Sequence, residues 1–161
     1  MVQTGLASDA ALVYGLGAAQ YRGAAAALGR NTAQLTDAVR DTSSPANAAA
    51  FQAQWQRHIG DYVTFVRGVT RDSAGLRAAA AADLGDFSRD NAVQLSRVSG
   101  LPVGAIVPSL RIHTAGTLVV IRLQAQRDPA QYAEAAMGTV HFATVGDRLG
   151  AAAAKRLGLP D

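Results

Sequence analysis

The chain of 161 residues contains no cysteine, a single glutamate (Glu134) and a single lysine (Lys155). Without cysteine it has no disulfide, no thiolate nucleophile and no zinc-thiolate site. With one glutamate it cannot supply the inward glutamates and Glu-x-x-His motifs of a ferritin-like dimetal site. The lack of cysteine fits a cytosolic domain and an exported one equally well.

Catalytic motifs are missing too. The sequence has no His-Glu-x-x-His, no P-loop and no Gly-x-Ser-x-Gly elbow. Gly15-Leu16-Gly17 lies inside a helical pattern and not after a strand, which excludes a dinucleotide-binding turn. Aspartates such as Asp83, Asp86 and Asp147 have the spacing of surface residues, with no sign of an acid–base pair. We therefore expect no enzyme activity.

Charge and hydropathy limit the partners further. The formal charge is +3, and the arginines are spread singly with few aromatics among them, so we expect no nucleic-acid partner. The most apolar stretch, residues 105–123, contains Arg111 and His113, which argues against a membrane span. Residues 1–5 lack the basic and apolar regions of a signal peptide, which predicts a cytosolic protein or an exported chain already processed.

Capping residues and apolar periodicity predict a chain of helices. The expected segments are 10–29, a short one after a break at Gly29-Arg30-Asn31, 48–70, 73–96, 103–126 and 128–157. Ser44-Pro45, Ser73 and Asp128-Pro129 mark starts, and Gly100-Leu101-Pro102 and Gly158 mark stops. The pattern predicts an all-α fold, an antiparallel bundle of four or five long helices forming one domain over residues 1–161.

Two further features bear on the architecture. Pro108 is expected in the first turn of its helix, or else to kink it. The segments around His58 and His113 resemble each other faintly and each precedes a helix of similar length, which suggests a duplicated helical hairpin.

The three histidines of the chain, His58, His113 and His141, each fall on the apolar stripe of a different predicted helix. A buried imidazole costs free energy unless a metal, a ligand or a hydrogen-bond partner satisfies it. For His58 the sequence offers Asp61 or a tyrosine hydroxyl as partner, and for His113 it offers Thr117. Both histidines are thus candidate ligands or hydrogen-bonded core residues.

His141 has Met137 one turn before it on the same face. A thioether and an imidazole together suit copper. The candidate metal ligands are therefore His58, His113, His141 and Met137, provided that the three histidines converge on one point. The aromatic residues Tyr14, Tyr21, Trp55 and Tyr62 are the candidate lining of a site for haem or an apolar ligand, with Phe65 beside them.

Several short segments give the chain a resemblance to a family of exported bacterial helical-bundle proteins. They are Phe51-x-x-x-Trp55-x-x-His58-Ile59-x-x-Tyr62, Leu110-x-x-His113, His141 with Asp147-Arg148-Leu149-Gly150, and Asn31-x-x-x-Leu35-x-x-Ala38. The resemblance implies an extracytoplasmic bundle with a metal role for its histidines. The chain departs from the pattern at Tyr14-Gly15-Leu16, where a Glu-His pair is expected, and at Phe142, where methionine is common. Both departures remove potential ligands.

The leading hypothesis is a non-enzymatic, extracytoplasmic bundle, secreted or at the cell surface, that binds copper or haem through buried histidines. One alternative is a structural or protein-interaction module, self-associating or with another protein, whose histidines only satisfy core hydrogen bonds. Another is a binder of apolar small ligands, and a cytoplasmic location is the alternative to export.

Overall fold

The computed structural model describes residues 18–158, and within that range the chain is a bundle of five long helices with no strand. The helices are α2 (Ala18–Thr42), α3 (Pro45–Thr70), α4 (Ala74–Ser99), α5 (Val103–Ala125) and α6 (Ala130–Leu157). The all-α bundle expected from the sequence is confirmed. The proposed hairpin duplication stays a hypothesis.

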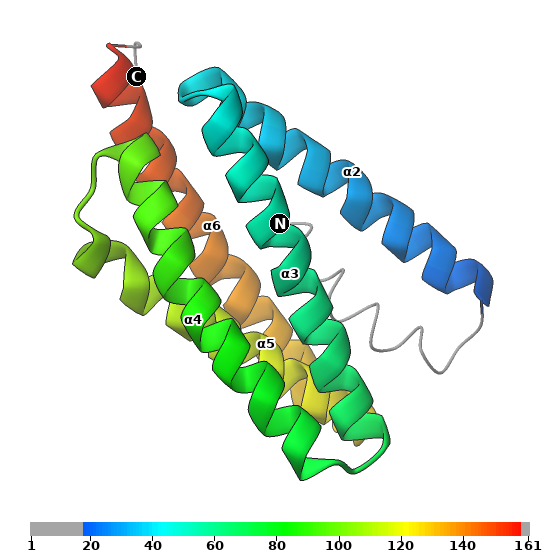
Figure 1. The fold of residues 1–161 in the computed structure, drawn as a ribbon. Coiled ribbons are helices and arrows are strands. Elements are labelled where there is room, and N and C mark those ends of the chain that lie inside the picture. The colour runs from blue at the N-terminus through cyan, green and yellow to red at the C-terminus, as the bar shows by residue number, and fades with distance from the viewer. Residues whose placement is uncertain (1–17, 159–161) are drawn as a thin grey trace.

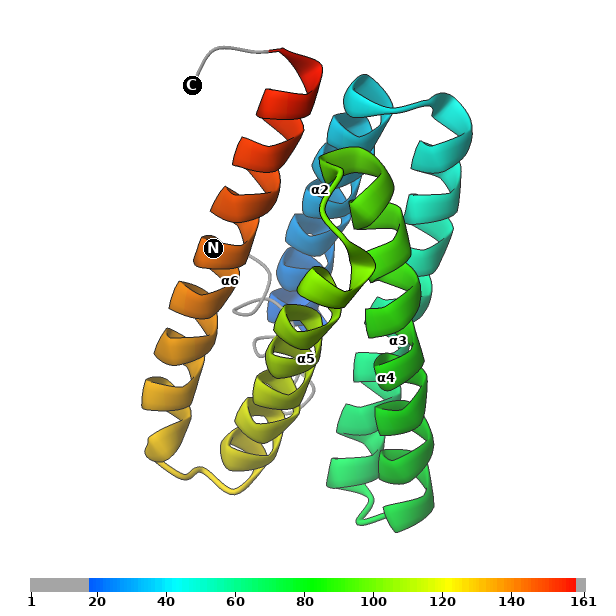
Figure 2. The ribbon, with the colours of Figure 1, turned by 90° about the vertical axis from the view of Figure 1, so that its left-hand side faces the viewer.

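Consecutive helices run antiparallel and contact each other, because the connections between them are short (Figures 1 and 2). Additional contacts join α3 to α5 and α4 to α6. Helix α2 packs mainly on α3 and leans away from it with distance from their shared turn (Figure 1). The bundle centre is therefore built by α3, α4 and α5.

Side-chain caps start two of these helices as the sequence predicts. The Ser44 hydroxyl accepts a hydrogen bond from Asn47 N at 3.2 Å, with Pro45 in the first helical position. The Ser73 hydroxyl accepts one from Leu76 N at 3.4 Å at the start of α4. These local bonds fix where the α2–α3 and α3–α4 turns end.

Glycine ends two helices, again as predicted. Gly100 closes α4 with φ 76° and Gly158 closes α6 with φ 68°, a left-handed backbone that costs glycine little. At the start of α6 the Asp128 carboxylate accepts from Ala130 N at 2.9 Å, in place of a regular cap.

Replacing Ser44 by alanine tests the first cap. We expect Ser44→Ala to lower the free energy of unfolding by about 1 kcal/mol, because Asn47 N loses its acceptor. Urea unfolding measures the change. The surface control Ser43→Ala removes a hydroxyl bonded to a carbonyl and not to a free helix N–H, so an equal loss in both variants would contradict the capping role.

The predicted break at Gly29-Arg30-Asn31 is wrong, because α2 runs through these residues without interruption. A single glycine inside a helix costs about 1 kcal/mol relative to alanine and does not by itself end it. Thr32 continues the helical pattern by donating from its hydroxyl to Leu28 O at 2.9 Å. Asn31 therefore caps nothing, and its Oδ1 is buried without a partner.

Helix α5 lies in the middle of the bundle. It alone among the helices of residues 18–158 is long and apolar enough to cross a membrane by length and composition. Its buried face, which includes Leu110, Thr117 and Ile121, packs against neighbouring helices as a core helix does. Pro108 lies beyond the first turn of α5, inside the helix, where it removes one backbone hydrogen bond.

Candidate functional site

His58 is buried on α3, with 2 % of its surface exposed. Its ring stacks on Phe87 of α4 at 3.9 Å between centroids and contacts the rings of Tyr62 at 4.6 Å and Trp55 at 5.2 Å. Its Nδ1 has no hydrogen-bond partner. Burial, and then the charge of His113, lower the His58 pKa from 6.5 to about 3, so the imidazole is neutral at pH 7.

His113 is buried on α5 in a similar way, with 8 % of its surface exposed. Its ring lies 4.4 Å from that of Phe142, and its Nδ1 also has no partner. Thr117, the expected partner, donates to the backbone oxygen of His113 at 2.9 Å and not to the ring. Burial, and then the charge of His141, lower the His113 pKa to about 4.

His141 and Met137 occupy different surroundings on α6. His141 is half-buried, and its Nε2 lies 3.2 Å from Ser109 O of α5. Met137 has 58 % of its surface exposed to solvent. Met137 therefore sits on the outside of the bundle, while the ring of His141 is turned toward α5.

His113 lies close enough to His58 to lower the pKa of His58, and His141 lies close enough to His113 to lower the pKa of His113. The three histidines do not gather into a metal cluster, however. Over the described residues no group of three or more histidine, cysteine, aspartate or glutamate side chains could hold a metal ion. The structure thus brings the histidines near one another without the convergence that a shared metal requires.

The aromatic candidates are core residues where the structure describes them. Trp55 packs against Phe51 and Phe87, and its Nε1 is buried without a partner. Burial raises the pKa of Tyr62 to about 12. The Tyr62 hydroxyl lies near the hydroxyls of two α5 threonines, which oppose that rise without making a hydrogen bond of good geometry. Tyr14 lies outside the described residues, as does the side chain of Tyr21.

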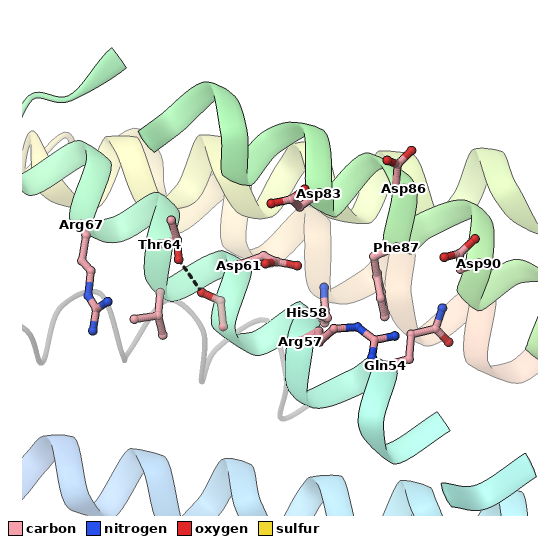
Figure 3. Close-up of a pocket in the computed structure, with 12 residues that line it drawn as sticks. Gln54, Arg57, His58, Asp61, Thr64, Arg67, Asp83, Asp86, Phe87 and Asp90 are labelled. Atoms are coloured by element: carbon pink, nitrogen blue, oxygen red, sulfur yellow. Dashed lines mark hydrogen bonds between the residues drawn. The ribbon is translucent and has the colours of Figure 1, made fainter. Parts of the chain in front are cut away.

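A pocket of about 720 Å³, lined mainly by polar residue types, opens between α3 and α4 (Figure 3). Neither Trp55 nor Tyr62 lines it, so the aromatic lining expected for an apolar ligand is absent from this pocket. Its walls come from both helices, and His58 with Phe87 lies between them. The lining residues are Gln54, Arg57, His58, Gly60, Asp61, Val63, Thr64, Arg67, Asp83, Asp86, Phe87 and Asp90.

Sequence reasoning considered His58 and Asp61 but missed Gln54 and the α4 aspartates as pocket residues. Their positions could have been predicted by counting residues outward from the turn at Asp72. Asp61 and Asp83 lie eleven residues before and after Asp72, and Gln54 and Asp90 lie eighteen before and after it. In an antiparallel hairpin such positions lie at similar heights. The aspartates therefore meet the α3 residues across the pocket, although their own spacing is that of surface residues.

Comparisons of the chain with protein-family models, with curated proteins and with solved structures find no match. The resemblance to the exported helical-bundle family stays a prediction. Function is consequently argued from the chemistry of the site alone.

Proposed function

We propose that this protein is a non-enzymatic bundle that binds a polar small molecule in the pocket between α3 and α4. The observation that carries the proposal is a pair of buried polar side chains on α3 that both line the pocket. His58 and Gln54 are 2 % and 6 % exposed, and His58 Nδ1 and Gln54 Oε1 have no hydrogen-bond partner. A buried polar atom left without a partner costs about 1–3 kcal/mol. Both atoms are enclosed, so a ligand in the pocket offsets this cost once the two side chains turn toward it.

The volume of the pocket supports the same proposal. Its volume of about 720 Å³ falls in the range of about 300–1,000 Å³ that is typical of small-molecule sites. Gly60 is one of the lining residues, and a Cβ at this exposed position would meet no atom within 4 Å. A larger side chain at Gly60 therefore fits there without moving other atoms.

A metal ion bound by histidine is the second candidate. His58 and His113 are both neutral at pH 7 and both have an unpartnered Nδ1, and neutral imidazole is the form that binds metal. The absence of a three-ligand group over residues 18–158 and the exposure of Met137 rank this candidate, copper included, below the pocket ligand. Haem ranks lower still, because the α3–α4 pocket has charged walls.

The structural alternative predicts that the histidines satisfy core hydrogen bonds. Of the three, only His141 has a hydrogen-bond partner within residues 18–158. His58 and His113 are instead buried with an unpartnered nitrogen. Only His58 lines the α3–α4 pocket, so His58 and not His113 favours a ligand-binding role over a purely structural one.

Filling the pocket from Gly60 tests the proposal. We expect Gly60→Met to weaken ligand binding at least about tenfold, because its side chain enters the open space beside Gly60. Calorimetric titration with spermidine, succinate, Cu²⁺, Zn²⁺ and haemin covers the main ligand classes.

The matched control is Gly146→Met on α6, where a Cβ likewise meets no atom within 4 Å and which lies outside the pocket lining. Binding that is lost in Gly60→Met and retained in Gly146→Met supports the proposal. No binding by any probe, or binding that both variants retain, overturns it.

A further inference from the structure

The α3–α4 pocket carries more negative than positive charge. Four aspartates line it, Asp61 on α3 and Asp83, Asp86 and Asp90 on α4, against two arginines. The arginines, Arg57 and Arg67, are exposed residues of α3. The pocket thus presents two carboxylates in excess although the whole chain has a net charge of +3.

Most of this negative charge is not paired. Within residues 18–158, Asp86 forms an ion pair with Arg89 at 3.1 Å, whereas Asp61, Asp83 and Asp90 form none. Partial burial, and then the charge of Asp83, raise the pKa of Asp61, and Arg57 opposes them only as a weaker effect. Asp61 and Asp83 therefore repel each other across the mouth of the pocket (Figure 3), and a cation between them removes that repulsion.

The floor of the pocket calls for hydrogen-bond donors. Gln54 Oε1 is an acceptor with no donor, and it is buried. His58 is neutral, so one of its ring nitrogens is also an acceptor, and Gln54 and His58 form no hydrogen bond with each other. Gln54 and neutral His58 each carry an N–H donor as well as an acceptor, so the floor can bind an amine. The aspartate carboxylates are what disfavour a carboxylate or phosphate ligand.

The carboxylates are spread along the helix and do not surround one point. Asp83 and Asp90 are seven residues apart on one face of α4, which separates them by about 10 Å along the helix axis. A metal ion needs its ligand atoms within about 2–2.6 Å of a single centre, and the described residues offer no such group of three. A chain with separated ammonium groups matches this spacing instead.

We propose that the α3–α4 pocket binds a linear aliphatic polyamine, whose ammonium groups lie between the carboxylates of Asp61, Asp83 and Asp90 and donate to Gln54 and His58. This inference rests on the proposed function and names its ligand class. The methylene segments between the ammonium groups lie against the ring of Phe87, the buried aromatic residue of the lining.

Calorimetric titration of the full chain with spermidine, butylamine, succinate and Mg²⁺ tests this ligand class. We expect spermidine to bind at least about tenfold more tightly than butylamine, because the single ammonium group of butylamine meets fewer carboxylates. We expect succinate and Mg²⁺ not to bind. Raising the salt concentration weakens spermidine binding, since the partner carboxylates are largely exposed.

The decisive variant is the double substitution Asp61→Asn with Asp83→Asn, which keeps the size of both side chains. We expect it to weaken spermidine binding about tenfold or more while leaving the thermal midpoint unchanged or higher, because it removes a repulsion. Asp147→Asn, on the exposed surface of α6 away from the pocket, is the control and leaves binding unchanged.

The outcomes separate this inference from the proposed function. Spermidine that binds no better than butylamine, or equally well to the double variant, overturns the polyamine assignment. If succinate binds instead and Gly60→Met blocks it, the pocket still binds a small molecule but the ligand class is wrong. If no probe binds, both proposals fail together.

Discussion

Lowering the pH from 8 to 5 is expected to reduce the free energy of unfolding of this protein by about 4 kcal/mol through two buried histidines alone. In the folded chain the pKa values of His58 and His113 are about 3 and about 4, against 6.5 for an ordinary histidine. Below pH 6.5 the unfolded chain therefore takes up a proton at each position while the folded chain stays neutral. The stability that the two neutral histidines contribute is fully present above pH 7 and is lost progressively as the pH drops toward 4.

The size of this effect is large compared with the total stability of a typical domain, about 5–15 kcal/mol. Near pH 5 the slope approaches about 2.7 kcal/mol per pH unit, the value for two protons. Asp61 acts in the opposite direction, because its pKa is raised and protonation at low pH favours the folded state. Mild acid is thus expected to remove a large part of the stability of the fold.

Urea unfolding curves recorded from pH 8 to pH 4 measure the slope. NMR of the imidazole nitrogens of the folded chain gives an independent measurement that needs no variant. We expect His58 and His113 to remain neutral in the folded protein at pH 5. Titration of both rings near pH 6.5, or a free energy of unfolding that does not change with pH, would contradict the burial that the structure assigns to them.

The second large effect is expected from Gly68→Ala, which should lower the free energy of unfolding by about 2 kcal/mol. Gly68 lies near the end of α3, where α4 approaches it closely. A Cβ at this position would lie 2.8 Å from Arg77 N and 3.1 Å from Leu76 Cβ. Because Arg77 N is backbone and not the end of a flexible side chain, the start of α4 must move to make room.

The carbonyl of Gly68 also stabilises the turn between α3 and α4. Gly68 O accepts hydrogen bonds from Ser73 N at 2.8 Å and from the Arg77 guanidinium at 3.0 Å. Moving α4 away from Gly68 stretches both bonds. Alanine gains about 1 kcal/mol of helix propensity over glycine, which reduces the net loss without cancelling it.

Gly60→Ala is the matched control, since it makes the same change in the same helix where a Cβ meets no atom within 4 Å. We expect Gly60→Ala to keep or raise stability by up to about 1 kcal/mol, opposite in sign to Gly68→Ala. For a chain of this length a change of 1 kcal/mol shifts the thermal midpoint by roughly 2–4 °C. Equal shifts in the two variants would show that the close approach at Gly68 does not govern stability.

The centre of the bundle also contains polar side chains. Ser88 of α4 and Thr114 of α5 share a hydrogen bond of 3.1 Å between their hydroxyls, next to the fully buried Leu84 whose carbonyl also accepts from Ser88. The interior of α3, α4 and α5 thus combines satisfied hydroxyls with unsatisfied groups such as His58 Nδ1 and His113 Nδ1. A ligand or proton that binds these groups therefore changes the stability of the core.

The sequence by itself determined the helices and most of their ends. Ser44, Ser73, Gly100 and Gly158 act within one turn of their own positions, through a cap or a left-handed backbone, so local sequence is enough to place them. The apolar periodicity of α3 and α5 likewise placed His58 and His113 in the interior. The break predicted after Gly29 was wrong because the cost of one glycine is small beside that of ending a helix.

Only the tertiary structure decided which side chains meet. Counting residues from the turn gives the similar height of Asp61 and Asp83, but the rotation of each helix depends on packing along its whole length, so the sequence does not show that the two side chains face each other. For the same reason the sequence could place His58 and His113 inside without showing that they form no metal cluster in the described chain. The periodicity of α6 put Met137 beside His141, but α6 covers the bundle from one side and leaves Met137 in solvent.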